Sequence, residues 1–311
     1  MNFNLENQNM FSVTILGNNS AVPAFDRHPT SQVVTLHDHS FLIDCGEGTQ
    51  MQMSKYKIRR SKINHIFISH LHGDHYYGLV GLLTSMGLLS RTTDLHLYAP
   101  AMLKEILDLQ FKVADTKLPY AVHFHPLKKE EIIFEDERCT VECFTTKHRI
   151  ECWGFLFREK KCPRKIVKEK VDEYNVPIEF YAQLKNSKDY VSVDGKIIKN
   201  ELLTIPNSPA CSYAFCADTL YDESLAEKVK NVSMIYHETT YLKDMSDKAT
   251  FRFHSTTEQA AQIAKLANVK KLLIGHFSSK YESLDEFLSE AKAVFENTEL
   301  AMEGTTFIIS N

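Results

Sequence analysis

Four side chains that can bind a metal ion lie within six residues of the sequence: His70, His72, Asp74 and His75. They follow a short apolar run, residues 65–69, that we expect to be a buried strand. On an extended segment the first three point to the same side, and a turn at Gly73 brings the last one round to join them. Imidazole and carboxylate groups are the ligands that Zn²⁺ prefers, so this spacing predicts a metal site rather than a polar surface loop.

This cluster has more ligands than one catalytic metal needs and fewer than two metals need. A catalytic zinc ion takes three protein ligands and keeps a fourth position for water. The cluster therefore needs partners from elsewhere in the chain, and it can be divided between two neighbouring metals. Because a water held between two cations becomes hydroxide near neutral pH, the segment predicts a two-metal hydrolytic site.

The missing ligands are expected at the ends of other strands, where sites form in open α/β sheets. Three candidates each follow a predicted strand: His148 after residues 139–146, Asp218 after residues 211–217, and His276 after residues 271–274. His123 and His125, which share one face of another predicted strand, are the main rival pair. Because the sequence places no carboxylate next to them, we interpret them as structural.

The elements that must position these residues alternate along the chain. Strand-like and helix-like segments follow one another, which favours a layered α/β domain. Ser255 with Glu258 predicts a capping box at the start of one helix, and Pro100 predicts the first residue of another. Residues 162–185 are charged and break this rhythm, so we expect an inserted arm or a long loop there.

Composition indicates a globular protein. The chain has 311 residues, of which 43% are hydrophobic, and a formal net charge of -4. The 7 Cys form no CxxC pair, which is typical of free thiols in a reducing compartment. No apolar run is long enough to span a membrane, and residues 1–10 lack the features of a signal peptide, so we expect a cytoplasmic protein. Two basic runs, residues 55–62 and 158–170, are either solvated surface or sites for phosphate groups.

The metal-binding segment, His70-x-His72-x-Asp74-His75, resembles the signature of the metallo-β-lactamase superfamily. Within it, the chain resembles the ribonuclease Z family, the endonucleases that remove 3′ trailers from precursor tRNA. Six blocks carry this resemblance: residues 16–31, 42–50, 66–79, 237–241, 254–261 and 275–281. Since the blocks span nearly the whole chain, they are more specific than the metal motif alone.

The resemblance implies a fold and a set of metal ligands. The expected fold is α/β, a four-layer αβ/βα sandwich formed by a single domain over residues 1–311, with a tRNA-binding arm inserted at about residues 158–188. Two zinc ions are expected in each subunit. Their implied ligands are His70, His72 and His148 for one ion, Asp74, His75 and His276 for the other, and Asp218 as a bridge between the two. The ligand set suits Mn²⁺ as well as Zn²⁺.

The resemblance also implies a mechanism, in which metal-activated hydroxide attacks a phosphodiester and leaves a tRNA 3′-hydroxyl. Asp74 is expected to orient or deprotonate the nucleophile. His254 is expected to protonate the leaving 3′-oxygen, a role that suits the pKa of His. Glu238 is expected either to orient His254 or to make a structural hydrogen bond.

Precursor tRNA and a second copy of the chain in a homodimer are the partners that the resemblance implies, with no membrane. The arm departs from the family, because residues 176–184 keep Pro177 and Leu184 but lack the glycines of a Gly-Pro-rich block. Two alternatives remain: a small-molecule phosphodiesterase on the same scaffold, and a catalytically silent RNA-binding subunit. The presence of all seven expected ligands favours an enzyme over the silent subunit.

Overall fold

The computed structural model describes residues 11–160, 163–207 and 209–310. It divides into two compact units: the first runs to Arg158 and resumes over Cys211–Ser310, and the second is Glu159–Ala210. Residues 1–10 and Cys162, which were part of the sequence-based expectations for location and thiols, lie outside the described residues. No helix in the described ranges is both long and apolar enough to cross a membrane.

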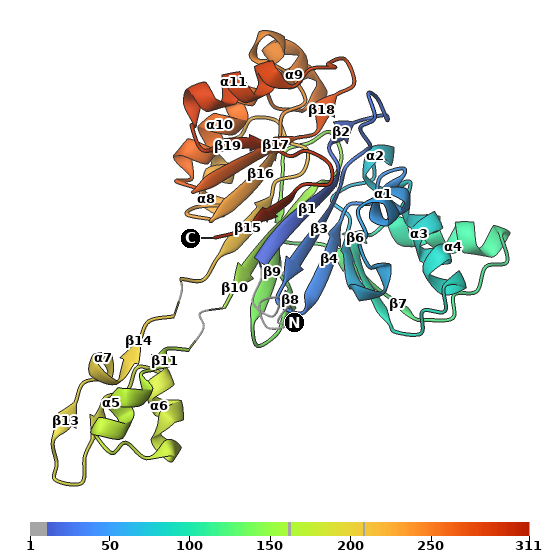
Figure 1. Ribbon diagram of the computed structural model, residues 1–311. Helices are drawn as coiled ribbons and strands as arrows, with labels where there is room; N and C mark the ends of the chain where they lie inside the picture. Colours follow the sequence, from blue (N-terminus) through green and yellow to red (C-terminus); the bar gives the residue numbers. More distant parts are fainter. Residues whose placement is uncertain (1–10, 161–162, 208, 311) are drawn as a thin grey trace. The chain divides into compact units, whose positions relative to one another are not determined.

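A sheet of seven strands forms one half of the first unit (Figure 1), in the order β20-β1-β3-β4-β5-β6-β7. The strands are β1 (Phe11–Gly17), β3 (Ser31–Leu36), β4 (His39–Ile43), β5 (Ile63–Phe67), β6 (Leu95–Pro100), β7 (Val122–Leu127) and β20 (Thr306–Ile308). The four strands from β4 to β7 run parallel. Their carboxyl ends therefore lie at the same edge of the sheet, where the segment after β5 begins.

A second sheet of seven strands faces the first, in the order β19-β17-β16-β15-β10-β9-β8. The strands are β8 (Glu131–Glu135), β9 (Cys139–Thr145), β10 (Trp153–Glu159), β15 (Ser212–Phe215), β16 (Met234–Glu238), β17 (Lys271–Gly275) and β19 (Thr298–Leu300). The strands β15, β16, β17 and β19 run parallel. The residues that follow β15 and β17 thus emerge at one edge of this sheet.

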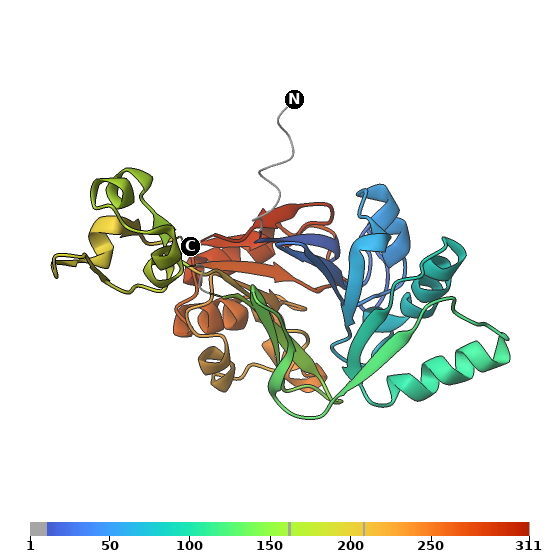
Figure 2. The same ribbon diagram turned by 90° about the horizontal axis from the view of Figure 1, so that it is seen from below.

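Helices cover the outer face of each sheet, so the first unit has four layers, helix, sheet, sheet and helix (Figures 1 and 2). The helices on the first sheet are α1 (Thr49–Lys55), α3 (Leu79–Leu88) and α4 (Leu103–Val113), and those on the second are α8 (Ser224–Lys228), α10 (Thr257–Leu266) and α11 (Asp285–Val294). Leu82 of α3 packs in one cluster with Leu97 of β6, and Ile263 of α10 packs in another with Leu272 of β17. The predicted αβ/βα sandwich is confirmed.

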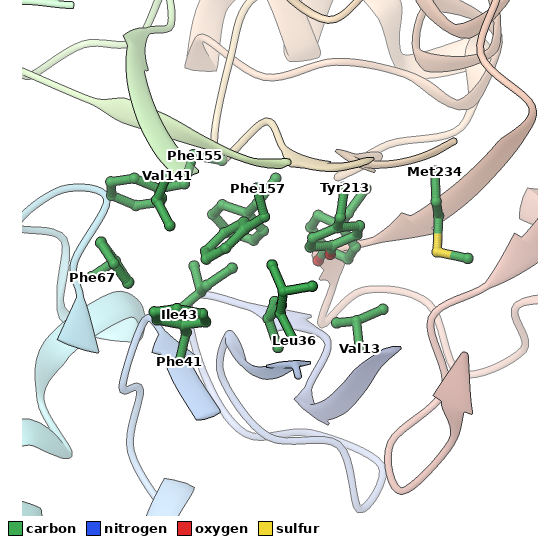
Figure 3. Close-up of a cluster of buried hydrophobic side chains, with 14 of the residues drawn as sticks. Val13, Leu36, Phe41, Ile43, Phe67, Val141, Phe155, Phe157, Tyr213 and Met234 are labelled. Carbon is green, nitrogen blue, oxygen red and sulfur yellow. The ribbon is translucent and has the colours of Figure 1, made fainter. Parts of the chain in front are cut away.

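Aromatic side chains fill the space between the two sheets (Figure 3). Phe67 of the first sheet lies 5.3 Å, centroid to centroid, from Phe155 of the second, and Phe41 lies 5.4 Å from Phe157. All four side chains are fully buried, and each such ring pair adds about 0.5–1.5 kcal/mol beyond its area burial. This packing fixes the strand ends of one sheet relative to those of the other.

The remaining elements of the first unit are short and lie around the strand ends. They are β2 (Asn19–Ser20), which pairs with β18 (Phe277–Ser278), the 3₁₀ turns η2 (Arg60–Lys62) and η4 (Lys243–Met245), and the helices α2 (Gly73–Tyr76) and α9 (Ser246–Arg252).

The prediction that Pro100 opens a helix is wrong. Pro100 is the last residue of β6, and α4 begins at Leu103. A proline has no N–H to donate to a strand ladder, but this loss is tolerated at a strand end. The isolated sequence signal is ambiguous because a proline suits both positions.

The predicted capping box lies one residue too early in the chain. The helix α10 is capped by Thr256 and Gln259, whose side chains and backbone N–H groups bond reciprocally. The Ser255 hydroxyl is directed instead at the carbonyl oxygen of Thr219, to which it donates at 2.7 Å. A contact with a distant part of the chain thus decided between two adjacent capping residues.

The second unit has its own small core. Its elements are β11 (Lys165–Ile166), α5 (Lys168–Glu173), η3 (Ile178–Phe180), α6 (Tyr181–Lys185), β12 (Tyr190–Val191), β13 (Ile197–Ile198), α7 (Asn200–Leu203) and β14 (Thr204–Ile205). Val171, Leu184 and Leu203 are buried together, and the amide of Asn200 donates to the carbonyl of Leu184 at 2.8 Å. This compact unit extends well past residue 188.

Candidate metal centre and active site

The strand β5 carries the ligand-rich segment into the interior, and His70, soon after its end, is fully buried. His72 has extended backbone, and Gly73 opens the one-turn helix α2. Asp74 and His75 therefore project from a helical turn rather than from an extended segment. The change of backbone conformation at Gly73 lets four close neighbours in sequence point at two adjacent positions.

Three imidazoles converge at the first of these positions. The Nε2 atom of His70 lies 3.0 Å from Nδ1 of His72, and the Nε2 atom of His148 lies 3.1 Å from the same Nδ1. His148 reaches the cluster from the loop after β9. With Asp218, these residues form a group whose ligand atoms all lie within 4.8 Å of one another.

A second group forms beside the first, from Asp74, His75 and His276. The two Nε2 atoms of His75 and His276 lie 3.3 Å apart. The Oδ2 atom of Asp74 lies 3.6 Å from Nε2 of His75 and 3.4 Å from Nε2 of His276. His276 is in the left-handed region, with φ 60, directly after β17.

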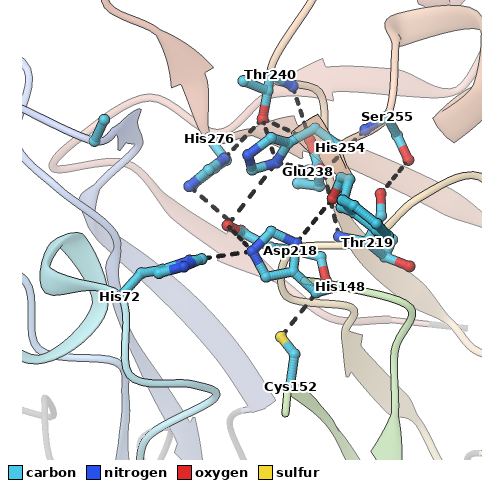
Figure 4. Close-up of polar contacts among 12 residues, drawn as sticks. His72, His148, Cys152, Asp218, Thr219, Glu238, Thr240, His254, Ser255 and His276 are labelled. Carbon is cyan, nitrogen blue, oxygen red and sulfur yellow. Dashed lines mark hydrogen bonds and ion pairs between the residues drawn. The ribbon is translucent and has the colours of Figure 1, made fainter. Parts of the chain in front are cut away.

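Asp218 lies between the two groups (Figure 4). Its Oδ2 atom is 3.6 Å from Nε2 of His70, and its Oδ1 atom is 3.3 Å from Nε2 of His276. The side chain is almost completely buried. The structure thus brings together all seven residues that the sequence analysis expects as ligands, with one carboxylate oxygen facing each group.

The donor chemistry of these groups fits metal ions. Burial, with nearby imidazoles, lowers the pKa of His70 well below its usual value and that of His72 to about 4, so both rings are neutral and have a free lone pair. Burial also lowers the pKa of His75, but the carboxylates of Asp218 and Asp74 outweigh it and hold that pKa well above its usual value. Positive charge is therefore stabilised at the centre of this cluster, which is the place that a metal cation would take.

Each group is oriented by hydrogen bonds on the side away from the cluster. Nδ1 of His148 donates to the carbonyl oxygen of Phe253 at 2.8 Å, and Nδ1 of His276 lies 2.9 Å from Oγ1 of Thr240. Nδ1 of His75 lies 2.7 Å from Oδ2 of Asp44. Such outer contacts fix the tautomer and leave Nε2 free to bind a metal.

Asp44 is a buried carboxylate that contacts the outer nitrogen of His75. The variant Asp44→Asn tests whether this contact orients His75 for metal binding. Ser69 N–H, which donates to Asp44 Oδ1 at 2.7 Å, can still bond the amide oxygen. The amide –NH₂ would instead face the N–H of His75, so we expect metal affinity to fall by roughly 10–100-fold. Competition with a zinc chelator measures this.

The matched control for that variant is Asp38→Asn, which changes a surface carboxylate that is 72% exposed and pairs with Arg138. We expect it to leave metal affinity unchanged. Equal affinities for the Asp44→Asn protein and the unaltered protein would show that Asp44 does not hold His75 in a metal-binding orientation.

His254 lies at the mouth of the cluster and is paired with Glu238. Its Nδ1 atom is 3.0 Å from Oε1 of Glu238 and 3.2 Å from Oγ1 of Thr240. Burial lowers the pKa of His254, but the Glu238 carboxylate outweighs it and raises the pKa to about 9. Glu238 also accepts from the backbone N–H groups of Thr240 and Ser255, so its contacts are compatible with both the orienting and the structural role expected from the sequence.

A cleft of about 470 Å³ opens onto these residues. It is lined by Ser20, Ala21, His72, Gly73, Asp74, Tyr77, His148, Arg149, Asp218, Tyr241, Lys248, Arg252 and His254. Asp74, Asp218 and His254 are therefore accessible from the same space. A charged substrate that enters it meets carboxylates, imidazoles and three cationic side chains.

A curated relative, Ribonuclease Z of Bacteroides thetaiotaomicron, is 43% identical to this chain over 303 residues, which is 97% of this chain and 96% of the relative. The chain belongs to the ribonuclease Z family. It is therefore a hydrolytic enzyme, an endonuclease that acts on phosphodiester bonds.

Solved structures agree with this ribonuclease Z assignment at the level of the fold. Human tRNase Z, short form, has a TM-score of 0.69 and 24% identity, with 96% of this chain and 100% of that chain covered. The metallo-β-lactamase fold protein YhfI from Bacillus subtilis has a TM-score of 0.69 and 19% identity, with 96% and 99% covered. A family model described as Anti-Pycsar protein Apyc1 matches residues 11–163, which is just under half of the chain.

The rival histidine pair, His123 and His125, lies outside the cluster. His123 is exposed and its Nε2 atom lies 2.8 Å from Oδ2 of Asp94, so the expectation that it lacks a carboxylate is wrong. His125 bonds instead to His96, with the ring nitrogens 2.9 Å apart. Neither residue belongs to a group of three ligand-capable side chains within the described ranges.

Sequence reasoning missed the groups that orient the ligands. Asp44 directly follows the strand β4, and its side chain is fully buried. Asp218 is predicted as a ligand because it follows a predicted strand, and the same rule applies to Asp44. Thr240 follows β16, and in the sequence it is marked only by the resemblance of residues 237–241 to a family block. The carbonyl of Phe253 has no signal in the sequence, because any residue supplies a carbonyl.

Proposed function

We propose that this protein is a zinc-dependent endoribonuclease that removes the 3′ trailer from precursor tRNA and leaves a tRNA 3′-hydroxyl. The observation that carries the proposal is the convergence of seven ligand-capable side chains beside His254 in one cleft, in a chain of the ribonuclease Z family.

The residues present fit two metal ions. His70, His72 and His148 would hold one ion, Asp74, His75 and His276 would hold the other, and Asp218 would contact both. When bound, the ions neutralise charge on the phosphoryl oxygens and lower the pKa of the attacking water.

Asp74 is proposed to orient the attacking water or to accept its proton. Burial raises the pKa of Asp74, but the neighbouring His75 and His276 outweigh it and hold the pKa well below its usual value. The carboxylate is therefore ionised. Its Oδ2 atom also accepts the backbone N–H of Ala21 at 2.7 Å, which holds the carboxylate at the cleft wall.

His254 is proposed to give its proton to the leaving 3′-oxygen of the tRNA. The Glu238 carboxylate keeps the ring protonated at neutral pH, and Nδ1 is the atom engaged with that carboxylate. The other ring nitrogen, Nε2, is thus the one available to the leaving group. A general acid in this position contributes roughly 10²–10⁴-fold to the rate.

The second unit, Glu159–Ala210, is proposed as the part that binds tRNA. Its sequence carries ten Lys or Arg against eight Asp or Glu, whereas the whole chain is negative at -4. Two of its lysines, Lys168 and Lys170, form exposed ion pairs with Asp172 and Glu173. Such pairs are worth little, so a phosphate group can replace the acid.

Removal of this unit tests that role. Arg158 and Ser212 are direct antiparallel partners in β10 and β15, so Asn-Gly in place of residues 159–211 closes a hairpin. We expect the KM for precursor tRNA to rise at least about tenfold from the lost phosphate contacts. Hydrolysis of bis(p-nitrophenyl) phosphate, which needs only the metal centre, should stay within about twofold. A shortened protein that processes precursor tRNA with an unchanged KM would contradict the proposal.

Mapping the cleavage site tests the function itself. Purified protein with zinc is incubated with a precursor tRNA that carries a 3′ trailer, and the ends of both products are identified. The proposal expects a cut at the discriminator nucleotide with a 3′-hydroxyl on the tRNA. Turnover of small phosphodiesters without any tRNA cleavage would favour the small-molecule phosphodiesterase instead.

A homodimer is proposed by family resemblance alone, with precursor tRNA as the substrate of each subunit. We place the protein in the cytoplasm because Cys45, Cys143, Cys152 and Cys216 are buried free thiols, as is typical of reducing compartments.

A further inference from the structure

Three cationic side chains line the cleft: Arg149, Lys248 and Arg252. All three are exposed. Among the described residues none of them has an acidic partner within ion-pair distance, whereas nearby surface lysines do. Lys147 pairs with Asp222, and Lys243 pairs with Glu258. The three cations of the cleft are thus not neutralised by acidic side chains.

Arg149 lies directly against the metal-ligand cluster. Its Nη2 atom is 3.1 Å from Nε2 of His72, whose Nδ1 atom faces His70 and His148. When Nδ1 of His72 binds a cation, the proton of this neutral ring sits on Nε2. The N–H of His72 and the guanidinium of Arg149 are then both donors. Arg149 therefore needs a different acceptor, and the cleft that it lines can hold one.

Lys248 and Arg252 approach from α9, on the side of His254. They are one helical turn apart, and Arg252 precedes His254 by two residues. The Nζ atom of Lys248 lies 5.2 Å from the centroid of the Tyr241 ring, another wall of the cleft. Guanidinium and ammonium groups held beside a phosphoryl-transfer site are suited to bind a second phosphate.

We propose that Arg149, Lys248 and Arg252 form a subsite for the RNA phosphate next to the scissile one, on the 5′ side. This rests on the proposed function, in which His254 protonates the leaving 3′-oxygen. The 5′ nucleotide must then lie on the side of His254, and its own 5′-phosphate is the next negative charge that α9 can reach. The subsite positions the RNA and takes no part in bond cleavage.

The variant R149A/K248A/R252A tests the subsite in the full-length, zinc-loaded protein. We expect the KM for precursor tRNA, and the Kd measured by fluorescence anisotropy in EDTA, to rise roughly 10–100-fold from the lost charge-assisted bonds. Hydrolysis of bis(p-nitrophenyl) phosphate, which has no neighbouring phosphate, should fall far less than cleavage of precursor tRNA. The control K228A/K230A/K243A removes three charges outside the cleft and should alter neither KM nor Kd by more than about twofold.

A precursor with one neutral methylphosphonate identifies the phosphate that is bound. Placed on the 5′ side of the scissile bond, it should raise the KM of the unaltered protein but add little to the KM of the triple variant. Placed on the 3′ side, it should affect both proteins equally. Equal losses with the 5′ substitution, or an unchanged KM and Kd in the triple variant, would overturn the subsite. If the unaltered protein does not cleave precursor tRNA at all, the proposed function has failed instead.

Discussion

Replacement of Asp218 by Asn is expected to lower the rate of precursor tRNA cleavage by about 10³-fold or more, because several kcal/mol of charge stabilisation is lost. It should also lower the metal content from two ions per chain to at most one. The reason is geometric: one oxygen of Asp218 faces His70 and the other faces His276. An amide keeps only one of these acceptors and turns –NH₂ toward the other group.

Asp222→Asn is the matched control, since it makes the same change four residues later. Asp222 pairs with Lys147 at 3.1 Å, and its Oδ1 atom accepts the backbone N–H of Ser224. We expect full metal content and full activity in this protein. Measurement of metal by atomic emission, beside the cleavage rate, separates the two variants. Two ions per chain in an active Asp218→Asn protein would rule out a bridging role for this carboxylate.

Replacement of His254 by Ala is expected to slow precursor tRNA cleavage by roughly 10²–10⁴-fold, the usual contribution of a general acid. Metal content should be unchanged, because the implied ligand sets do not include His254. The loss should be small for bis(p-nitrophenyl) phosphate, since a nitrophenolate leaves without protonation. The ratio of the two losses therefore reports proton donation rather than damage to the metal centre.

His123→Ala provides the comparison for that variant. His123 is exposed and bonded to Asp94, away from the cleft, so its loss should alter neither rate. Equal losses with both substrates in the His254→Ala protein would mean that His254 supports the metal centre and does not act as the acid.

Much of the site was predictable because its residues follow strands. His148, Asp218 and His276 were selected by their positions after apolar runs, and the structure places all three at the cluster. The same rule applied to β4 would have found Asp44. One carboxylate within a block that resembles a family does not stand out by residue type.

The orientation of His148 was not predictable. Its Nδ1 partner is the carbonyl oxygen of Phe253, a residue with φ 60 at the end of α9. A non-glycine residue in the left-handed region has no strong sequence signature, and only the packed chain shows that its carbonyl accepts from Nδ1 of His148.

The extent of the second unit was only partly visible in the sequence. Charge and prolines mark its beginning, but its later part consists of two-residue strands with little periodicity. Asn200 closes this part by donating to the carbonyls of Leu184 and Lys188. Contacts made by one amide side chain leave no pattern along the chain.

The proposed function requires two metal ions to act together on an RNA phosphodiester in this cleft. Titration of metal-free protein with zinc, while cleavage of a precursor tRNA is followed, tests it most directly. We expect no cleavage in the presence of EDTA and a rate that reaches its maximum at two equivalents of zinc per chain. A maximum rate at one equivalent, or cleavage that persists without metal, would rule out joint action of two metal ions.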